Sequence, residues 1–281
     1  MKIFLITFLF PVTFFSQNNI RFIFKYDFAP SKLKKDSLIT SYMYLDTNGN
    51  ESNFCNEVKF KVDSIKRINN DFSLIFKEGK IDRNLNYNII KKYETKEITY
   101  YTKFTTIDFK IPENQTPNWK LSNEKKIIGK WSCQKAETNY KGRKWTAYFT
   151  NEIPINDGPY KFTGLPGFIV EIASEDNSHK FSLIQIKKIV QPYIPKSPKN
   201  VKTISYQEYQ NYLKNYRPLM SDIAGVNVNN GTSTYIMKDG SSVSINISKE
   251  TLNKYQNQKE KLGEIIMDKI ARQSDDNPIE E

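Results

Sequence analysis

Two carboxylates, Glu152 and Asp157, are the side chains of this 281-residue chain that could most directly do chemistry. An acid and a base on either side of a scissile bond support hydrolysis, and a pair of carboxylates is a common form of that arrangement. Both residues lie in a loop-forming stretch, where carboxylates are usually solvated, and no neighbouring pattern orients them. The sequence therefore favours a non-enzymatic binding or interaction protein, whose ligand could be a peptide, a lipid, a glycan or a partner protein. A cell-envelope hydrolase that uses these loop carboxylates is the alternative.

Other patterns for catalysis or metal binding are weak. His179 is the only histidine, and its polar setting, EDNSHK, predicts an exposed side chain rather than a member of a Ser-His-Asp triad. One histidine and two cysteines cannot complete a structural zinc site. The stretch Gly164-Leu165-Pro166-Gly167 lacks the GxxxxGK(S/T) pattern of a phosphate loop. We expect neither a metal nor a cofactor.

The same region holds candidate binding residues. Arg143 could pair with Glu152, Asp157 or Glu171, or it could recognise an anion. The aromatic residues nearby could line a sugar- or peptide-binding face, although an aromatic strand more often packs in a core. The candidate set is Arg143, Trp145, Tyr148, Glu152, Asp157, Tyr160 and Phe162.

A loop of fixed shape is expected between Thr150 and Gly167. Proline restricts φ and glycine admits positive φ, so a segment rich in both favours one conformation. Apolar alternation on both sides predicts two strands that hold its ends. Leu165 would then either plug the core or lie on a rim presented to a ligand. The structural residues of this loop are Pro154, Gly158, Pro159, Gly164, Leu165, Pro166 and Gly167.

Alternation of apolar and polar residues dominates residues 17–190 and predicts a mainly β fold. We expect a curved antiparallel β-meander of about nine to eleven strands, open or half-barrel. The expected strands are Ile20–Phe28, Ser37–Asp46, Asn53–Ile65, Phe72–Lys77, Glu97–Phe104, Thr106–Ile111, Lys125–Ile128, Trp131–Ala136, Lys144–Thr150, Phe168–Ser174 and Lys180–Val190.

Residues 191–281 are expected to belong to the same domain, with α-helices packed on the open side of the sheet. Ser205 and Glu208 have the spacing of a capping box, and Asp239-Gly240 is a hairpin signal. The expected elements are a proline-rich connector at 191–200, a helix from Ser205 to about Tyr216, a hairpin at 233–247, a long helix from Ser248 to about Arg272 and a frayed tail at 274–281.

The N-terminus predicts export. Lys2 precedes an apolar run from Ile3 to Phe15 and the small Ser16, which is the pattern of a signal peptide at residues 1–16. The run is too short for a transmembrane helix. We therefore expect no transmembrane span after its removal, and a location in the periplasm, at the outer membrane or outside the cell.

The predicted export bears on whether the two cysteines form a disulfide. An oxidising compartment favours a disulfide between Cys55 and Cys133, and two separate buried thiols are the alternative. The net charge of +11 comes from scattered lysines without a compact arginine cluster. We therefore do not expect a nucleic-acid partner.

Four stretches between Trp119 and Ile172 resemble the GLPGLI family of exported Bacteroidota proteins. They are WKLSNEKK from Trp119, WSCQKA from Trp131, Gly142-Arg143 with Trp145, Ala147 and Tyr148, and the run from Ile153-Pro154-Ile155 through Gly158-Pro159-Tyr160-Lys161-Phe162 to Gly164-Leu165-Pro166-Gly167. The motif continues as Phe168-Ile169 where the family has Leu-Ile. The resemblance implies export, a β-rich fold and an envelope partner such as an outer-membrane transport component. It implies no agreed reaction.

Overall fold

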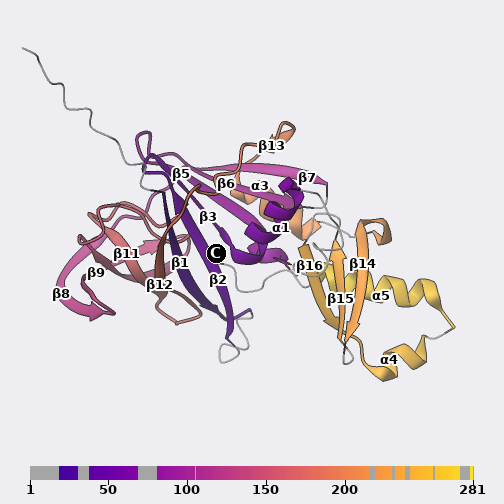
Figure 1. Ribbon diagram of the computed structural model, residues 1–281. Coiled ribbons are helices and arrows are strands. Elements are labelled where there is room, and N and C mark those ends of the chain that lie inside the picture. Colours follow the sequence, from indigo (N-terminus) through magenta and orange to yellow (C-terminus); the bar gives the residue numbers. More distant parts are fainter. Residues whose placement is uncertain are drawn as a thin grey trace, which may run out of the picture.

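A computed structural model describes residues 19–30, 38–68, 81–104, 106–215, 219–229, 232–237, 241–255, 257–272 and 279–280. The expected signal peptide, the expected strand Phe72–Lys77 and the Asp239-Gly240 turn lie outside these residues. Within the described residues, a large curved sheet wraps around one side of the protein (Figure 1). Its strands, in the order in which they pair, are β13 (Val201–Thr203), β7 (Ile107–Glu113), β6 (Ile98–Phe104), β5 (Tyr87–Lys92), β3 (Glu51–Asn56), β2 (Ile39–Thr47), β1 (Ile20–Phe28), β12 (His179–Lys188), β11 (Phe168–Ser174), β10 (Arg143–Thr150), β9 (Trp131–Tyr140) and β8 (Lys120–Ile128).

This sheet confirms the mainly β fold expected from the alternation. Neighbouring strands run antiparallel except β13, which runs parallel to β7. The strands at the two edges, β13 and β8, do not pair with each other, so the sheet is open. An open, curved antiparallel sheet was one of the two forms that the sequence predicted.

Aromatic side chains form the core on the concave face of the sheet. In β1, Phe22, Phe24 and Tyr26 share one face and are at most 2% exposed. Rings from neighbouring strands stack on them, with centroid distances of 4.1 Å both for Phe22 and Phe168 and for Tyr26 and Phe181. Large flat rings bury much apolar surface for little loss of conformational freedom, which favours this core.

Helix α3 (Tyr206–Asn215) covers part of that core. It begins at the predicted capping box, where the Ser205 hydroxyl donates to Glu208 Oε2 at 2.8 Å and the Glu208 N–H donates to Ser205 Oγ at 3.2 Å. Tyr209 and Tyr212 then pack on Phe109 of β7, at centroid distances of 5.4 and 5.2 Å. This C-terminal helix therefore lies on the sheet as the sequence predicted.

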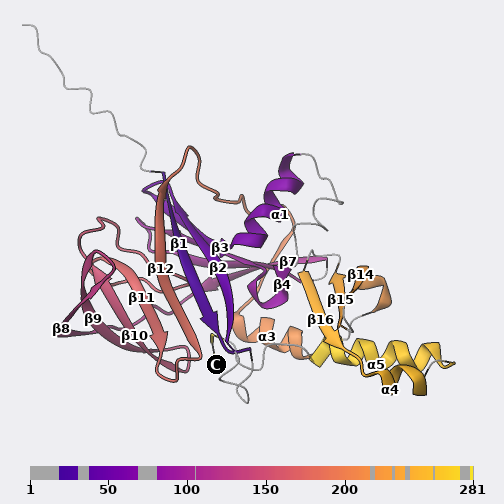
Figure 2. The ribbon, with the colours of Figure 1, turned by 60° about the horizontal axis from the view of Figure 1, so that its bottom comes forward.

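A second, four-stranded sheet lies beside the large one (Figures 1 and 2). Its strands, in order, are β14 (Ile223–Asn229), β15 (Thr232–Met237), β16 (Ser241–Asn246) and β4 (Ile81–Asp82). The predicted hairpin at 233–247 corresponds to β15 and β16, while β4 comes from the N-terminal half of the chain. Two short 3₁₀ helices, η1 (Arg83–Leu85) and η2 (Met220–Asp222), precede β5 and β14.

The long helix expected from Ser248 to Arg272 is two helices, α4 (Lys249–Lys254) and α5 (Lys259–Arg272). Ser248 does cap α4, since its hydroxyl accepts the Thr251 N–H at 3.1 Å. The break falls around Asn257, a residue type with weak helix propensity. Ile270 of α5 is fully buried against the small sheet, so this helix covers the second sheet rather than the large one.

One predicted strand was wrong over most of its length. Residues Asn53–Ile65 were expected to form a strand, but β3 ends at Asn56 and helix α1 (Glu57–Ile68) follows. The Asn56 side chain accepts the Val58 N–H at 2.8 Å and so caps the helix. Val58, Val62 and Ile65 have the spacing of one helix face and pack together, and ion pairs one turn apart favour the helix. Those pairs are Glu57–Lys61 and Lys59–Asp63.

Strand β5 was missed although it lies well inside the large sheet. Its residues Tyr87 to Lys91 are all buried, because both faces of the sheet are covered at this point. A strand that is buried on both faces shows no alternation of apolar and polar residues. The criterion that found the other strands therefore could not find this one.

The predicted disulfide was also wrong, because Cys55 and Cys133 are free, buried thiols. Cys55 lies on β3 and Cys133 on β9, with β2, β1, β12, β11 and β10 between them. Strands in a sheet are about 4.8 Å apart, and a disulfide requires Cα atoms within about 7 Å. The sheet topology therefore keeps the two cysteines apart.

We expect both thiols to be alkylated by iodoacetamide in guanidinium without any reductant, which mass spectrometry would detect as two added groups. Burial raises the pKa of both thiols, that of Cys133 to about 11. Because the thiolate is the reactive form, the folded protein should react much more slowly under the same conditions. An unfolded chain that takes up no label would instead indicate a bridge.

Candidate functional site

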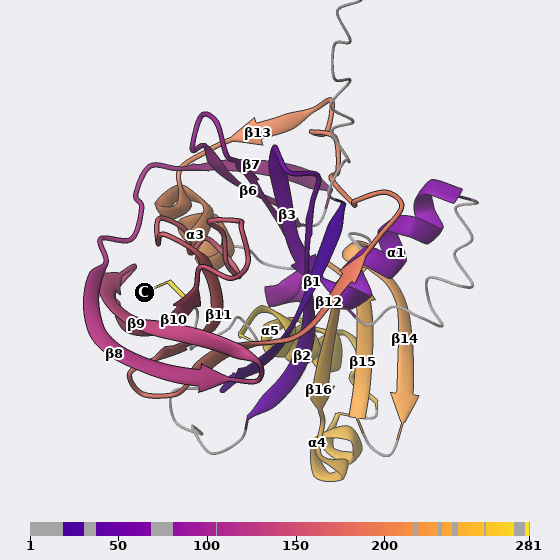
Figure 3. The same cartoon turned by 60° about the vertical axis from the view of Figure 1, so that its left-hand side comes forward.

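The loop between β10 and β11 folds inward, into the concave side of the large sheet (Figure 3). Ile153, Tyr160, Phe162 and Leu165 are at most 6% exposed and join the aromatic core. Of the two roles expected for Leu165, plugging the core is therefore the observed one. Other loop residues remain at the surface, and these include Glu152, Pro154, Gly164 and Pro166.

Glycine and proline give this loop its close packing. A Cβ atom added to Gly167 would lie well inside van der Waals contact with the Thr150 carbonyl oxygen, so only glycine fits there. Gly164 has a φ of +91°, which other residues rarely adopt. The Pro159 carbonyl accepts the Phe162 N–H at 3.1 Å and closes a turn. These contacts agree with the fixed shape that the sequence predicted.

A buried ion pair ties the middle of the loop to the sheet. Asp157 pairs with Lys91 of β5, and the two side chains are 0% and 2% exposed. The Lys91 ammonium also donates to the Gly158 carbonyl at 2.5 Å. The Asp157 carboxylate accepts the hydroxyl of Ser52 at 2.6 Å and that of Tyr93 at 2.9 Å. These partners offset the cost of removing two charges from water.

Burial also shifts the pKa values of Lys91 and Tyr93. Burial lowers the pKa of Lys91, although the neighbouring carboxylate of Asp157 opposes the shift. Burial and the same carboxylate raise the pKa of Tyr93 far above its usual range. The Asp157 carboxylate is therefore enclosed by donors, which occupy the positions from which it could act as a general base.

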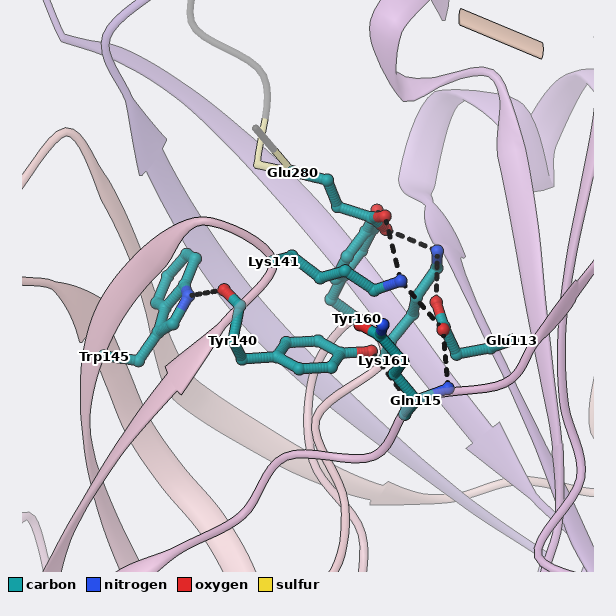
Figure 4. A network of polar contacts seen from close by, with 8 residues as sticks. All are labelled: Glu113, Gln115, Tyr140, Lys141, Trp145, Tyr160, Lys161 and Glu280. Carbon is teal, nitrogen blue, oxygen red and sulfur yellow. Dashed lines mark hydrogen bonds and ion pairs between the residues drawn. The ribbon is translucent and has the colours of Figure 1, made fainter. Parts of the chain in front are cut away.

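A second ionic network holds Lys161, which is fully buried (Figure 4). Its ammonium pairs with Glu113 of β7 at 3.0 Å and with Glu280 near the C-terminus. Lys141, in the turn between β9 and β10, pairs with Glu113 at 2.8 Å. The Tyr160 hydroxyl donates to Glu280 at 2.6 Å. Two lysines thus face two carboxylates, and the network as a whole is neutral.

Ile279 and Glu280, the described part of the expected frayed tail, contradict that expectation. The Glu280 side chain is 1% exposed, and the neighbouring Ile279 packs against the core of the large sheet. Burial alone would raise the pKa of Glu113, but Lys161 and Lys141 lower it below its usual range. The network therefore keeps Glu113 ionised inside the protein.

The outer side of the loop lines a groove of about 820 Å³. Residues 91–93 and 96–98, on either side of the β5–β6 turn, form another wall, and Gly49, Thr116 and Pro117 also line the groove. The lining contains both apolar and charged side chains, and Lys92 pairs with Glu97 at 3.1 Å. Ligand-binding clefts in proteins have volumes of this order. The lining residues used below are Lys92, Lys96, Ile98, Pro117 and Ile155.

The aromatic candidates separate into two groups. Trp145 and Phe162 are fully buried with ring centroids 4.7 Å apart, and Tyr160 is 3% exposed. These three pack in the core, which was the alternative interpretation of an aromatic strand. Tyr148 lies on the opposite face of β10, where Lys126 Nζ is 4.8 Å from its ring centroid. The candidates therefore do not form one continuous aromatic surface.

Arg143 has a partner that the sequence did not suggest. It pairs with Asp176 at 3.8 Å and donates to the Ser178 hydroxyl at 3.2 Å. Strands β10 and β11 are antiparallel, with Trp145 opposite Ser174, so the turn after β11 lies beside Arg143. The ion pair therefore ties Arg143 to the β11–β12 turn.

The two carboxylates do not face one cavity. Glu152 is exposed and accepts the Ser132 N–H at 2.8 Å, whereas Asp157 is enclosed with Lys91. The expected exposure of His179 was wrong, because it begins β12 opposite Phe28 and is 1% exposed. Its ring is hydrogen-bonded to the Tyr26 hydroxyl at 2.7 Å.

Sequence reasoning missed Lys91, Lys161 and Glu280. Lysine and glutamate are almost never fully buried unless they are paired, so their type predicted exposure. The available signal was local, because Lys161 lies between two aromatic residues and Lys91 follows Ile89-Ile90. In the described part of the chain, no group of three or more potential metal ligands occurs. No helix in those ranges is long and apolar enough to cross a membrane.

Replacing Gly167 with alanine should lower the free energy of unfolding by about 1–3 kcal/mol, the usual cost of overpacking. The matched control is Gly263→Ala in α5, where nothing lies within 4 Å of the added Cβ. A glycine to alanine change in a helix should be neutral or stabilising by up to about 1 kcal/mol. Urea unfolding measures both changes, and equal midpoints for the two variants would contradict the tight packing of the loop.

A double-mutant cycle on Lys91 and Asp157 tests the buried pair. Asp157→Asn and Lys91→Met should each cost about 3–5 kcal/mol, because each leaves one uncompensated charge inside the protein. The double variant should recover much of that loss, so the two effects should not add. The exposed pair Lys144–Glu175 provides the control, since Glu175→Gln should change stability by less than about 1 kcal/mol. Additive losses at Lys91 and Asp157 would exclude strong coupling.

Comparisons with known proteins give a short family match and a likeness in fold. A family model described as "Protein of unknown function (Porph_ging)" matches residues 137–171, which contain the whole loop. No curated protein matches the chain. Two structures of PNGF-II, in space groups C2 and P21, match at 14% and 13% identity with TM-scores of 0.50 and 0.51. The matches cover 71% and 76% of this chain.

This chain spans only 33% and 36% of the two PNGF-II chains. A third structure, an uncharacterized conserved protein from Thermus thermophilus, matches at 7% identity with a TM-score of 0.34 and covers 68% of this chain and 91% of its own. At such identities, the PNGF-II structures show a shared fold and nothing about activity. The family match is to the segment that forms the end of β9, all of β10, the loop and the start of β11.

Proposed function

We propose that this protein is an exported, non-enzymatic binding protein of the cell envelope, and that the groove beside the 150–167 loop receives a segment of a partner protein. The observation that carries the proposal is the groove itself, of about 820 Å³, with one wall made by the loop. The Porph_ging match covers the same loop but assigns it no function.

Preorganisation supports a binding role. The Lys91–Asp157 pair and the glycine contacts hold the loop in one shape before any partner arrives. A preformed binding surface loses less conformational entropy on association than a mobile one. The buried ion pair of Asp157 with Lys91 therefore also matters at the surface, because it fixes the wall of the groove.

The lining favours an extended peptide with acidic residues. Ile98, Pro117 and Ile155 contribute apolar surface to the groove. Lys92 pairs with Glu97 in the same lining, and Lys96 leaves a net positive charge there. An extended peptide presents side chains to both sides at short intervals and can use both kinds of contact. The protein's net charge of +11 would also attract an acidic partner.

The carboxylates support binding over hydrolysis. Glu152 is exposed and bonded to a backbone amide, and Asp157 is enclosed by Lys91, Ser52 and Tyr93. An acid/base pair has to reach one substrate bond from two sides. These two groups are held in different surroundings, so we assign no catalytic role to either.

The proposal also includes export and membership of the GLPGLI family. The N-terminal pattern of a signal peptide at residues 1–16 supports export, and the GLPG-type motifs around the loop support a place in the GLPGLI family. We infer a partner in the envelope, with an outer-membrane transport component as the leading candidate. The protein would then lie in the periplasm, at the outer membrane or outside the cell.

Capture from envelope extract with a charge-neutralised groove tests this function. The test variant is Lys92→Gln with Lys96→Asn, because Lys96 has a φ of 58° and asparagine tolerates that conformation. Quantitative mass spectrometry should show at least a tenfold loss of the enriched partner. The control, Lys187→Gln with Lys188→Gln on the exposed end of β12, removes the same charge and should retain the partner. Equal capture by the two folded variants would rule out the groove as the binding site.

A further inference from the structure

We propose a second binding site, which recognises a peptide carboxylate through Lys161, Lys141 and Tyr160, and whose occupant in this structure is Glu280 of the chain's own tail. An acidic peptide from another protein would then compete with the tail for this site. The site shares no residue with the groove beside the loop, so the two proposals stand on separate observations.

Glu280 is held as a ligand is held in a built pocket. Its carboxylate is 1% exposed, pairs with the fully buried Lys161 and accepts the Tyr160 hydroxyl at 2.6 Å. Lys141 approaches the second oxygen, Oε2, at 3.8 Å. Figure 4 shows these groups converging from the loop and from the β9–β10 turn on one carboxylate.

Aromatic rings shape the pocket around the ammonium of Lys161. Its Nζ lies 4.9 Å from the ring centroid of Tyr206, 5.2 Å from that of Tyr100 and 5.5 Å from that of Tyr160. Cations are attracted to the faces of such rings at distances within about 6 Å. The rings therefore keep the charge of Lys161 in place and restrict the direction from which a carboxylate can reach it.

The charge balance requires an anion at this position. Among the described residues, Lys161 and Lys141 form ion pairs with Glu113 and Glu280, so without Glu280 two positive charges would share one carboxylate. A buried charge without a partner is strongly unfavourable. A neutral ligand could not restore the balance, whereas a glutamate or aspartate side chain could.

A surface hollow lies beside the pocket. A hollow of about 480 Å³ is lined by Glu113, Lys141 and Tyr206, which also belong to the network around Glu280. In the tail, Ile279 packs against the core beside Glu280. The recognised element is therefore short: an aliphatic side chain followed by a carboxylate.

The test uses a fluorescent peptide, NPIEE, which copies residues 277–281, and the protein shortened to end at residue 278. Fluorescence anisotropy should show saturable binding to the shortened protein and at least tenfold weaker binding to the full chain, whose own tail fills the site. The peptide NPIQE, which lacks the carboxylate that matches Glu280, should bind at least tenfold more weakly. Binding of NPIEE and NPIQE with equal affinity, or no binding to a folded shortened protein, would overturn the proposal.

If the shortened chain does not fold, variants of the full-length chain test the same proposal. Glu280→Gln should increase binding of NPIEE at least fivefold over the unchanged full chain, because the amide holds the tail less tightly. Glu264→Gln, at an exposed position of α5, removes the same charge and should leave binding unchanged. Equal binding by these two variants would overturn the proposal. Binding of NPIEE that is lost in the Lys92→Gln, Lys96→Asn protein would place the peptide in the loop groove and would also overturn it.

Discussion

The inward position of the 151–167 loop depends on the neutralisation of its two buried charges. Asp157 and Lys161 both lie inside the curved sheet, and each meets opposite charge contributed by a distant part of the chain. An unpaired charge in such a place costs about 3–5 kcal/mol, a large part of the 5–15 kcal/mol by which a typical domain is stable. The partners on β5, on β7 and near the C-terminus therefore stabilise the inward position of the loop.

This constraint also links the fold to function. The side of the loop that carries the buried charges is fixed against the sheet, so its other side is a wall of constant shape beside the groove. The proposed binding function uses that outer wall, and the proposed carboxylate site uses Lys161 and Tyr160 on the inner side. One rigid segment can thus serve two recognition events that share no side chain.

Much of the architecture could be predicted from local patterns. The alternation in β1, the capping box at Ser205 and the glycine-proline loop each depend on residues close together in the sequence, and the structure has all three. Strand β5 and helix α1 were missed for a physical reason: a strand buried on both faces does not alternate, and a short apolar run fits two periods. The candidate site was predicted less well, because burial decides whether Trp145 and Asp157 face a ligand or the core.

Local sequence was sufficient to specify a strand-rich chain with a rigid turn-forming loop, since alternation, capping and backbone restrictions act over a few residues. Pairing across the sheet was decided only in three dimensions. Cys55 and Cys133 lie on strands too far apart to be bridged, and Arg143 meets Asp176 because β11 returns beside β10. Glu280 reaches Lys161 across more than a hundred residues. Such contacts depend on the order of strands in the sheet, which no local pattern encodes.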